Sequence, residues 1–532
     1  MHPAGPALTH RRITIAAALS IVAFAILGLR LLDLTIFPEP PDKDFKPRPL
    51  VTRADLVDRN GELLARDLPV HDLYAQPAEL RDRKAAAHEL ALATGASQVR
   101  LERLFTGKHK YVLVYRQLAP EAEATVRKLD IAGLEYAPAM KRYYPKGLAA
   151  VQVIGSTDID GNGLSGLEYG LNSRLEHASP GSQVVLSLDM RVQFALKHEV
   201  EAAREEFSAR AGGGIVMNVD TGEILAMASL PDAETPGVTE AANPRRNRMA
   251  EDDYELGSVF KIFSFAMAMQ DHTITLDRSF PIGKGFKIGK YLIGDAEKMP
   301  DTLKAEDIFA LSSNAGTAQI VLLSGPDRQR AFLNSLGLLA RRPTEIPESA
   351  APLLPRYWGQ IQTATIGFGH GISVSPLSFV TAAAVVVNGG RWIEPTFLKH
   401  TADARGRQVI SPATSEIMRS LLRYVVTNGT GKKADVPGYD VGGKTGSAEK
   451  AANGRYVAHR LLTSFCAVFP ISNPRYLVFV MLDEPHGTKE TGGWALAGYT
   501  AAPLAGRVIA RIAPMLGMPA SGPVLAEVKS NP

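Results

Sequence analysis

Two pairs of side chains in this sequence have the chemistry of a serine-based acyl transfer. Ser258 and Lys261 stand three residues apart, and Ser312 and Asn314 form a second pair further along the chain. A serine hydroxyl is a poor nucleophile until a neighbouring base takes its proton. A lysine becomes such a base when burial and a nearby positive charge lower its pKa. We therefore expect Ser258 as nucleophile, Lys261 as base, Ser312 as proton relay, and Asn314 as a ligand of both the lysine and the substrate.

A third segment supplies a carboxylate-binding group. Lys444, Thr445 and Ser447 bring one positive charge and two hydroxyls, which together suit a substrate carboxylate. Gly446 leaves room for the backbone of a ligand to approach closely. The charge of Lys444 is also the one expected to lower the pKa of the catalytic lysine. The backbone N–H groups of Ser258 and Ser447 are the expected oxyanion hole.

The third segment also matches two other patterns. Ser447 and Lys450 form a second serine–lysine pair, but residues three apart on a strand point to opposite faces, so we expect them not to cooperate. Residues 438–445 match the phosphate-binding loop of NTPases. That loop requires a helix directly after it, whereas Asn453-Gly454 predicts a turn close behind. The turn argues against this match, and an NTPase is kept only as an alternative.

Particular helices and strands must carry these side chains if they are to meet. A helix through Ser258 and Lys261 places both on one face, and the apolar residues that follow fit a buried helix. Apolar runs at 214–219 and 223–230 flank an Asp-Thr-Gly turn and predict a hairpin. Three more strands and a closing helix are expected, at residues 441–448, 461–469, 476–482 and 494–516. Strands at both ends of this region predict an α/β domain with one shared sheet.

The N-terminus predicts a membrane anchor. Arg11 and Arg12 precede an apolar segment long enough to span a bilayer. Positive charge on that side favours a cytoplasmic N-terminus, and a cleaved signal peptide is the alternative. We expect a cytoplasmic tail (1–12), a transmembrane anchor (13–36), a pedestal domain (37–205), a catalytic domain (206–516) and a disordered tail (517–532). Within the pedestal, helices are expected at 81–94 and after Pro120.

Composition narrows the classes of ligand and partner. The net charge is only +4 over 532 residues, and no long Lys/Arg run is present, so no nucleic acid is expected as a partner. Cys466 is the single cysteine, which rules out an intrachain disulfide, and its apolar surroundings predict a core residue. No His-Glu-x-x-His and no Cys/His ligand spacing occurs, so neither a metal nor a cofactor is expected.

Several segments together resemble class B penicillin-binding proteins. Residues 254–261 resemble the family's active-serine segment, although Leu256 stands where a proline is common. Ser312-Ser313-Asn314 and Lys444-Thr445-Gly446 match the second and third motifs. Further likenesses lie at residues 53–61, 116, 142–145, 163–168 and 367–376. The resemblance covers nearly the whole chain after the anchor.

The resemblance implies a D,D-transpeptidase that cross-links peptidoglycan through an acyl-enzyme on Ser258 and that β-lactams acylate. It implies an α/β (α+β) fold of the transpeptidase/β-lactamase type, with a central antiparallel sheet between helices, after an α+β pedestal of the dimerisation type. The substrates would be stem peptides, with a D-Ala-D-Ala donor and an amine acceptor. An FtsW-type glycan polymerase and small divisome membrane proteins would be partners. The setting would be the division septum at the bacterial inner membrane, with the catalytic domain periplasmic.

The sequence leaves alternatives open for the subgroup within the family and for the reaction that the protein performs. Glu255 and the run at 441–450 look more like the septal, FtsI-type group than the elongation group. An elongation-type member remains an alternative within the family. A β-lactam-hydrolysing or sensing relative, and a catalytically silent scaffold that keeps the motifs, are alternatives outside this reaction.

Overall fold

The computed structural model describes residues 17–28 and 52–520, except 108, 148, 180, 233, 236–244, 343, 401–405 and 453–454. Two compact units result. The head unit contains Pro69–Lys141, and the main unit contains Thr52–Leu68 together with the chain from Arg142 onward. The expected boundary between residues 205 and 206 lies inside the main unit.

The predicted anchor falls largely outside the described residues. Residues 17–28 are helical, whereas the rest of 13–36 and the whole tail 1–12 are not described. The same holds for most of the C-terminal tail, from residue 521. None of the helices within the described ranges combines the length and the apolar character that crossing a bilayer requires.

The head unit is a small layer of helices against strands. Its helices are α2 (Arg83–Thr94), α3 (Gln98–Thr106) and α4 (Pro120–Lys128), and β3 (Val112–Leu118) pairs with β2 (Leu63–Ala75), which in turn pairs with β4 (Leu134–Tyr143). The Asp82 carboxylate caps α2, and Gly95 ends it with a φ of 74° that favours glycine. The helices predicted at 81–94 and after Pro120 are therefore confirmed.

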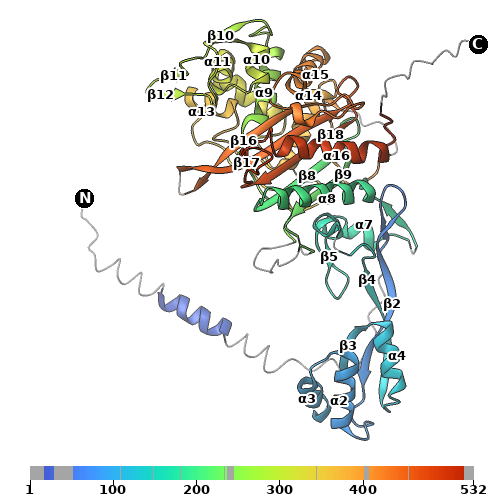
Figure 1. The fold of residues 1–532 in the computed structure, drawn as a ribbon. Helices are drawn as coiled ribbons and strands as arrows, with labels where there is room; N and C mark the ends of the chain where they lie inside the picture. The colour runs from blue at the N-terminus through green and yellow to red at the C-terminus, as the bar shows by residue number, and fades with distance from the viewer. Residues whose placement is uncertain are drawn as a thin grey trace, which may run out of the picture. The chain divides into compact units, whose positions relative to one another are not determined.

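The core of the main unit is a five-stranded sheet in the order β16-β17-β18-β8-β9 (Figure 1). Its strands are β8 (Ala211–Asn218), β9 (Ile224–Leu230), β16 (Gly442–Ala452), β17 (Arg455–Phe469) and β18 (Tyr476–Asp483). Every neighbouring pair is antiparallel. The chain thus builds one sheet from its two distant ends, as the apolar runs predicted.

Helices cover both faces of this sheet. Alternate residues of β18 enter different cores: Leu477 and Phe479 pack with α9 (Lys261–Gln270) and α14 (Pro376–Val387), and Val478 and Val480 pack with α8 (Met190–Glu206) and α16 (Ala501–Met515). This follows from the two-residue period of a strand. Because both faces are buried, the strand is an unbroken apolar run.

The closing helix begins later than the sequence predicted. The expected span was 494–516, whereas α16 runs from Ala501 to Met515. Pro503 lies in the first turn of α16 and favours this start, whereas Pro514 lies at the other end of the helix. In the first turn of a helix the missing N–H of proline is harmless, but in the interior it removes a hydrogen bond and clashes with the preceding turn. A helix from residue 494 would have put Pro503 in its interior.

The remaining elements of the main unit connect these layers. They are β1 (Asp55–Val57), α5 (Val151–Ile154), β5 (Ser156–Thr157), β6 (Gly163–Ser165), α6 (Gly166–Gly170), α7 (Asn172–Glu176), β7 (Gln183–Val185), η2 (Gly257–Phe260), β10 (Ser279–Pro281), β11 (Phe286–Ile288), β12 (Tyr291–Ile293), β13 (Thr302–Lys304), α10 (Ala305–Ala310), α11 (Asn314–Ser324), α12 (Pro326–Ser335), α13 (Gln360–Gly367), β14 (Arg391–Trp392), β15 (Arg407–Gln408), α15 (Pro412–Thr427) and η3 (Lys432–Ala434).

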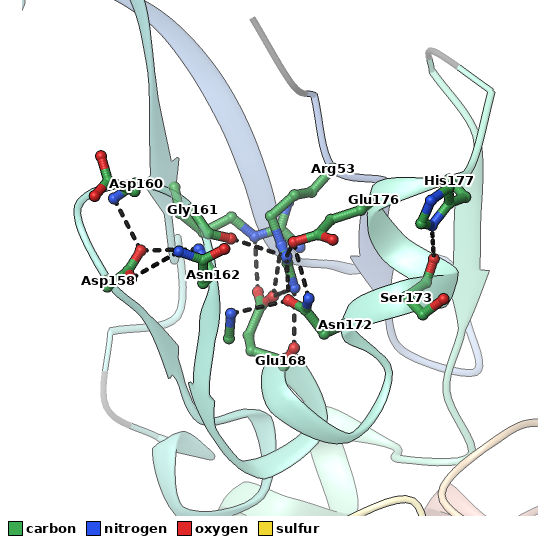
Figure 2. A network of polar contacts seen from close by, with 12 residues as sticks. Arg53, Asp158, Asp160, Gly161, Asn162, Glu168, Asn172, Ser173, Glu176 and His177 are labelled. Carbon is green, nitrogen blue, oxygen red and sulfur yellow. Dashed lines mark hydrogen bonds and ion pairs between the residues drawn. The ribbon is translucent and has the colours of Figure 1, made fainter. Parts of the chain in front are cut away.

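A buried ion network joins the start of the main unit to its later segments (Figure 2). The Glu168 carboxylate is fully buried and accepts from Arg53 at 2.7 Å and from Arg142 at 2.7 Å. Arg53 also donates to Asn172, and Arg142 pairs with Asp67. Three segments that resembled family motifs therefore meet at one carboxylate. Burial of such a group is tolerable only because each charge is paired.

Candidate active site

Ser258 and Lys261 meet through a tighter turn than an α-helix. Residues Gly257–Phe260 form the 3₁₀ turn η2, and α9 begins at Lys261. Residues three apart eclipse one another in a 3₁₀ turn. The Lys261 Nζ accordingly lies 3.0 Å from the Ser258 Oγ. The lysine is fully buried, whereas the serine is half-buried and open to a substrate.

The second pair lies in the turn between α10 and α11. Ser312 has a φ of 64°, a left-handed conformation that costs a residue with a side chain ~1 kcal/mol or more. This conformation directs both oxygens of Ser312 at Lys261, whose Nζ lies 2.5 Å from the carbonyl and 3.1 Å from the hydroxyl. Asn314 adds its Oδ1 at 2.8 Å. The backbone strain at Ser312 is thus offset by contacts within the site.

The hydrogen bonds of Lys261 leave it ready to act as a base. The Ser312 carbonyl and the Asn314 Oδ1 can only accept, so they take both N–H groups of a neutral amine. Its lone pair then remains for the Ser258 hydroxyl. Burial lowers the pKa of Lys261 well below its ordinary value, and the charge of Lys444 lowers it further. Asp295 acts in the opposite direction on the same pKa.

Lys444 reaches the same cluster from the strand β16. Its Nζ donates to the Ser312 Oγ at 2.9 Å and lies 3.1 Å from the Thr445 carbonyl. Ser312 therefore stands between the two amines and can pass a proton in either direction. Burial alone lowers the pKa of Lys444 to about 7. Thr445 is only 6 % exposed and directs its Oγ1 toward the same amine, at 3.4 Å.

The backbone around the expected oxyanion hole is closely packed. A Cβ at Gly257 would lie 2.8 Å from the carbonyl oxygen of Ser447, and one at Gly446 would lie 2.6 Å from that of Leu256. Two glycines therefore let the segment before Ser258 lie directly against β16. This brings the residues expected to form the hole together. The Ser447 Oγ accepts from the N–H of Ala497 at 3.0 Å, which leaves its own hydrogen free to donate.

The competing patterns in this segment do not fit the structure. Lys450 pairs with Asp483 and Glu484, at 2.7 and 2.8 Å, rather than with Ser447. The phosphate-loop pattern fails as well, because Lys444 and Thr445 lie on strand β16, which pairs antiparallel with β17, and the described residues place no helix between the two strands. Among the described residues, no group of three or more His, Cys, Asp or Glu side chains is placed to hold a metal ion.

Three residues around the site make contacts that were not foreseen from the sequence. Asp295 accepts hydrogen bonds from Ser313 and from the first N–H groups of α11. Thr430 contacts the hydroxyl of Thr445 at 2.6 Å. Glu255 accepts from the N–H of Gly371 and from the Tyr456 hydroxyl. The sequence does not show which partners such single polar residues contact, because only the tertiary structure places them side by side.

His370 lies at the edge of the same region. Its ring packs against Tyr456 and Phe368, with centroid distances of 5.2 and 5.5 Å. Burial lowers its pKa to about 4, with a further contribution from the charge of Lys261. It is neutral at physiological pH and packs between these two rings. Cys466 is 1 % exposed, as predicted for a core residue, and burial raises its pKa to about 12.

Two protein-family models match the chain. Residues 212–506 match the penicillin binding protein transpeptidase domain, and residues 49–184 match the penicillin-binding protein dimerisation domain. The chain belongs to the penicillin-binding protein family. The two matches lie on either side of the boundary expected between residues 205 and 206, and the transpeptidase match contains the whole cluster around Ser258.

Individual relatives resemble this penicillin-binding protein over most of its length. A probable peptidoglycan D,D-transpeptidase FtsI of Caulobacter vibrioides is 39% identical over 483 residues, with 88% of this chain and 82% of the relative covered. A probable peptidoglycan D,D-transpeptidase PenA of Neisseria meningitidis is 31% identical over 516 residues, covering 90% and 87%. The resemblance to class B, FtsI-type members is thereby confirmed.

Solved structures confirm the predicted fold class. Penicillin binding protein 3 of Mycobacterium tuberculosis, complexed with aztreonam, superposes with a TM-score of 0.69 at 24% identity, covering 89% of this chain and 98% of that chain. The transpeptidase domain of penicillin-binding protein 3 from Burkholderia pseudomallei gives a TM-score of 0.57 at 30% identity, covering 64% and 98%. Both therefore share the fold of the part of this chain that they match.

Proposed function

We propose that this penicillin-binding protein is a septal peptidoglycan D,D-transpeptidase that works through an acyl-enzyme on Ser258. One observation carries the proposal: Ser258, Ser312 and Asn314 all contact the buried amine of Lys261, and Lys444 shares Ser312 with it. The relatives named peptidoglycan D,D-transpeptidases support the reaction type. The roles of the individual residues are inferred from their geometry.

In the first half-reaction, the Ser258 Oγ attacks the carbonyl carbon of the penultimate D-alanine of a donor stem peptide. Lys261 takes the hydroxyl proton through its free lone pair. The N–H groups of Ser258 and Ser447 donate to the carbonyl oxygen as it becomes negative. The proton then passes through Ser312 to the nitrogen of the terminal D-alanine. The C–N bond breaks, D-alanine leaves, and the acyl group stays on Ser258 as an ester.

In the second half-reaction, an acceptor amine attacks the ester carbonyl. A new C–N bond forms, the C–O bond to Ser258 breaks, and Lys261 transfers a proton from the amine to the departing serine oxygen. A β-lactam completes only the first half. Its C–N bond opens in the same way, but the leaving nitrogen remains tethered to the acyl group. The tethered group blocks the acceptor, so the ester persists.

Lys444 and Thr445 bind the carboxylate of the donor peptide and so position the bond that breaks. The terminal D-alanine and most β-lactams carry a carboxylate near the bond that breaks. An ammonium with an adjacent hydroxyl binds such a group by charge-assisted hydrogen bonds. The same positive charge keeps Lys261 neutral, because two nearby cations are unfavourable. One residue thereby serves both binding and base activation.

The cellular setting extends the proposal. We infer a bacterial inner-membrane protein, anchored through residues 13–36, whose periplasmic domain acts at the division septum beside an FtsW-type glycan polymerase and divisome membrane proteins. The match to an FtsI-type relative supports the septal group. An elongation-type role is the alternative within the family, and hydrolysis or sensing of β-lactams is the alternative fate of the acyl-enzyme.

Intact-protein mass spectrometry after β-lactam treatment tests the mechanism. We expect a stable adduct on the wild type and on Ser264→Ala, and none on Ser258→Ala. Ser264 is the matched control because it also lies three residues from Lys261, but its hydroxyl bonds the Gly367 carbonyl. An adduct on Ser258→Ala would refute the nucleophile. An adduct that disappears within minutes would favour the hydrolase.

A further inference from the structure

A second threonine lies behind the carboxylate-binding group. Thr430 follows α15, and its Oγ1 lies 2.6 Å from the Oγ1 of Thr445. Its backbone is held on two sides, since its N–H donates to the Ala310 carbonyl and a Cβ at Gly498 would lie 2.8 Å from its carbonyl oxygen. Thr430 is exposed, whereas Thr445 is 6 % exposed. The fixed backbone of Thr430 thus presents its hydroxyl to the buried hydroxyl of Thr445.

The direction of this hydrogen bond decides what Thr445 can offer a substrate. A threonine hydroxyl has one hydrogen and two acceptor lone pairs. The ammonium of Lys444 has only donors, so Thr445 accepts from it. If Thr445 also donated to Thr430, only a lone pair would face the substrate carboxylate, and the two would repel. If Thr430 donates instead, both lone pairs of Thr445 are filled and its hydrogen is free for the carboxylate.

The exposure of the two residues favours the second arrangement. Water can satisfy the lone pairs of the exposed Thr430, which frees its hydrogen for Thr445. The buried Thr445 has far less access to solvent. Within the described part of the chain, the only hydrogen-bond partner of the Thr430 side chain is Thr445. Hydroxyls in such a chain also polarise one another, which strengthens the terminal donor.

We propose that Thr430 is a positioning residue for carboxylate recognition: it donates to Thr445 and so turns the Thr445 hydroxyl into a donor for the anionic group of the substrate. The inference rests on the proposed function, because it refines the group that holds the donor carboxylate. Thr430 itself touches neither the reacting atoms nor the lysines. Its effect is therefore confined to ligands that carry the anion.

Acylation rates with paired ligands test this role in the full-length protein. Benzylpenicillin carries the free carboxylate, and its methyl ester lacks the charge. We expect Thr430→Val to lower the second-order acylation rate with benzylpenicillin about fivefold, the usual effect of one hydrogen bond, and to leave the ester unchanged. Thr430→Ser keeps the hydroxyl and restores the rate. Thr427→Val is the matched control, since that hydroxyl bonds Asn428 on the exposed side of the same segment.

A double-mutant cycle separates positioning from general damage. In a Thr445→Val background, adding Thr430→Val has no further effect if Thr430 acts only through Thr445. Equal losses with penicillin and ester, or a full rate with penicillin, would overturn the inference. Thr430→Ala provides the same comparison if the valine does not fold. A penicillin adduct on Ser258→Ala would instead refute the proposed function, so the two failures are distinguishable.

Discussion

Asp295 offers a direct test of how the second motif is held in place. Its Oδ1 accepts from the N–H groups of Asn314 and Ala315, at 2.5 and 3.1 Å, and its Oδ2 accepts from the Ser313 hydroxyl at 2.8 Å. These groups begin α11, where backbone N–H groups have no partner within the helix. Asp295 therefore caps the helix that positions Ser312 and Asn314, and it also places a negative charge near Lys261.

Two substitutions separate the cap from the charge. Asp295→Asn keeps an oxygen for the two N–H groups, but it removes the charge and replaces the oxygen that accepts from the Ser313 hydroxyl with an amide NH2, so we expect a loss of about 1 kcal/mol of unfolding free energy. Asp295→Ala removes all three contacts and leaves the hydroxyl hydrogen of Ser313 and the N–H of Ala315, both in fully buried residues, without an acceptor. That loss is about 3 kcal/mol. Urea unfolding of both variants measures the difference.

The charge also has a consequence for the pH dependence of acylation. Asp295 raises the pKa of Lys261, in opposition to burial and to Lys444. Its removal lowers that pKa further. Because only neutral Lys261 can accept the serine proton, acylation declines as falling pH protonates it. We expect the acidic limb of Asp295→Asn to move to lower pH, measured as the acylation rate with benzylpenicillin.

Asp301→Asn is the matched control for this shift. It removes the same charge from an exposed position in the same segment, and no hydrogen bond given for the described residues joins its side chain to α11. Its acidic limb should coincide with that of the wild type. An unchanged limb in Asp295→Asn, or one that moves to higher pH, would refute the coupling between this carboxylate and Lys261.

Two further predictions concern the buried charges. Glu168→Gln removes the carboxylate between Arg53 and Arg142. We expect it to lower the free energy of unfolding in urea by about 3 kcal/mol, because a broken buried pair leaves a charge without compensation. Asp55→Asn is the control: its partner Arg66 is 47 % exposed, so the loss should be less than about 1 kcal/mol. Equal losses would contradict this account. Because the pKa of Lys444 is about 7, the free enzyme loses this charge as pH rises above that value, and acylation by benzylpenicillin should fall on the alkaline side while that of its methyl ester does not. An acylation rate with benzylpenicillin that stays constant as pH rises above 7 would contradict this role of the Lys444 charge.

The strands of the central sheet could be predicted from the sequence because the apolar residues of each strand themselves indicate that it is buried. The run at 476–482 is apolar, and the run at 214–219 is apolar except for Asn218, as expected for strands covered on both faces. The start of α16 was wrong because an apolar segment alone does not show where a helix begins. The position of Pro503 carried that information, and it became clear only with the helix in place.

The motif residues of the site could be predicted from the sequence, whereas the residues that orient them could not. Ser258, Lys261 and Lys444 belong to short motifs whose spacing indicates their chemistry. Asp295 and Thr430 belong to no motif, and each acts through one partner distant in sequence. Nothing local distinguishes them from ordinary loop residues. A polar side chain that orients another one therefore becomes visible only when both are placed in space.

The electrostatics of the two lysines link substrate binding to the activation of the nucleophile. Both are fully buried, and within the described residues neither is paired with a carboxylate, although Lys444 lies 5.8 Å from the face of Phe309. Burial of two cations so close together is unfavourable, so the free site holds less than two charges. A substrate carboxylate bound at Lys444 favours the charge on that amine. The charged Lys444 then keeps Lys261 neutral, and a neutral Lys261 is the form that can take the proton of Ser258. The carboxylate thus promotes acylation as well as binding, which is why its removal should lower the rate by more than the loss of affinity alone.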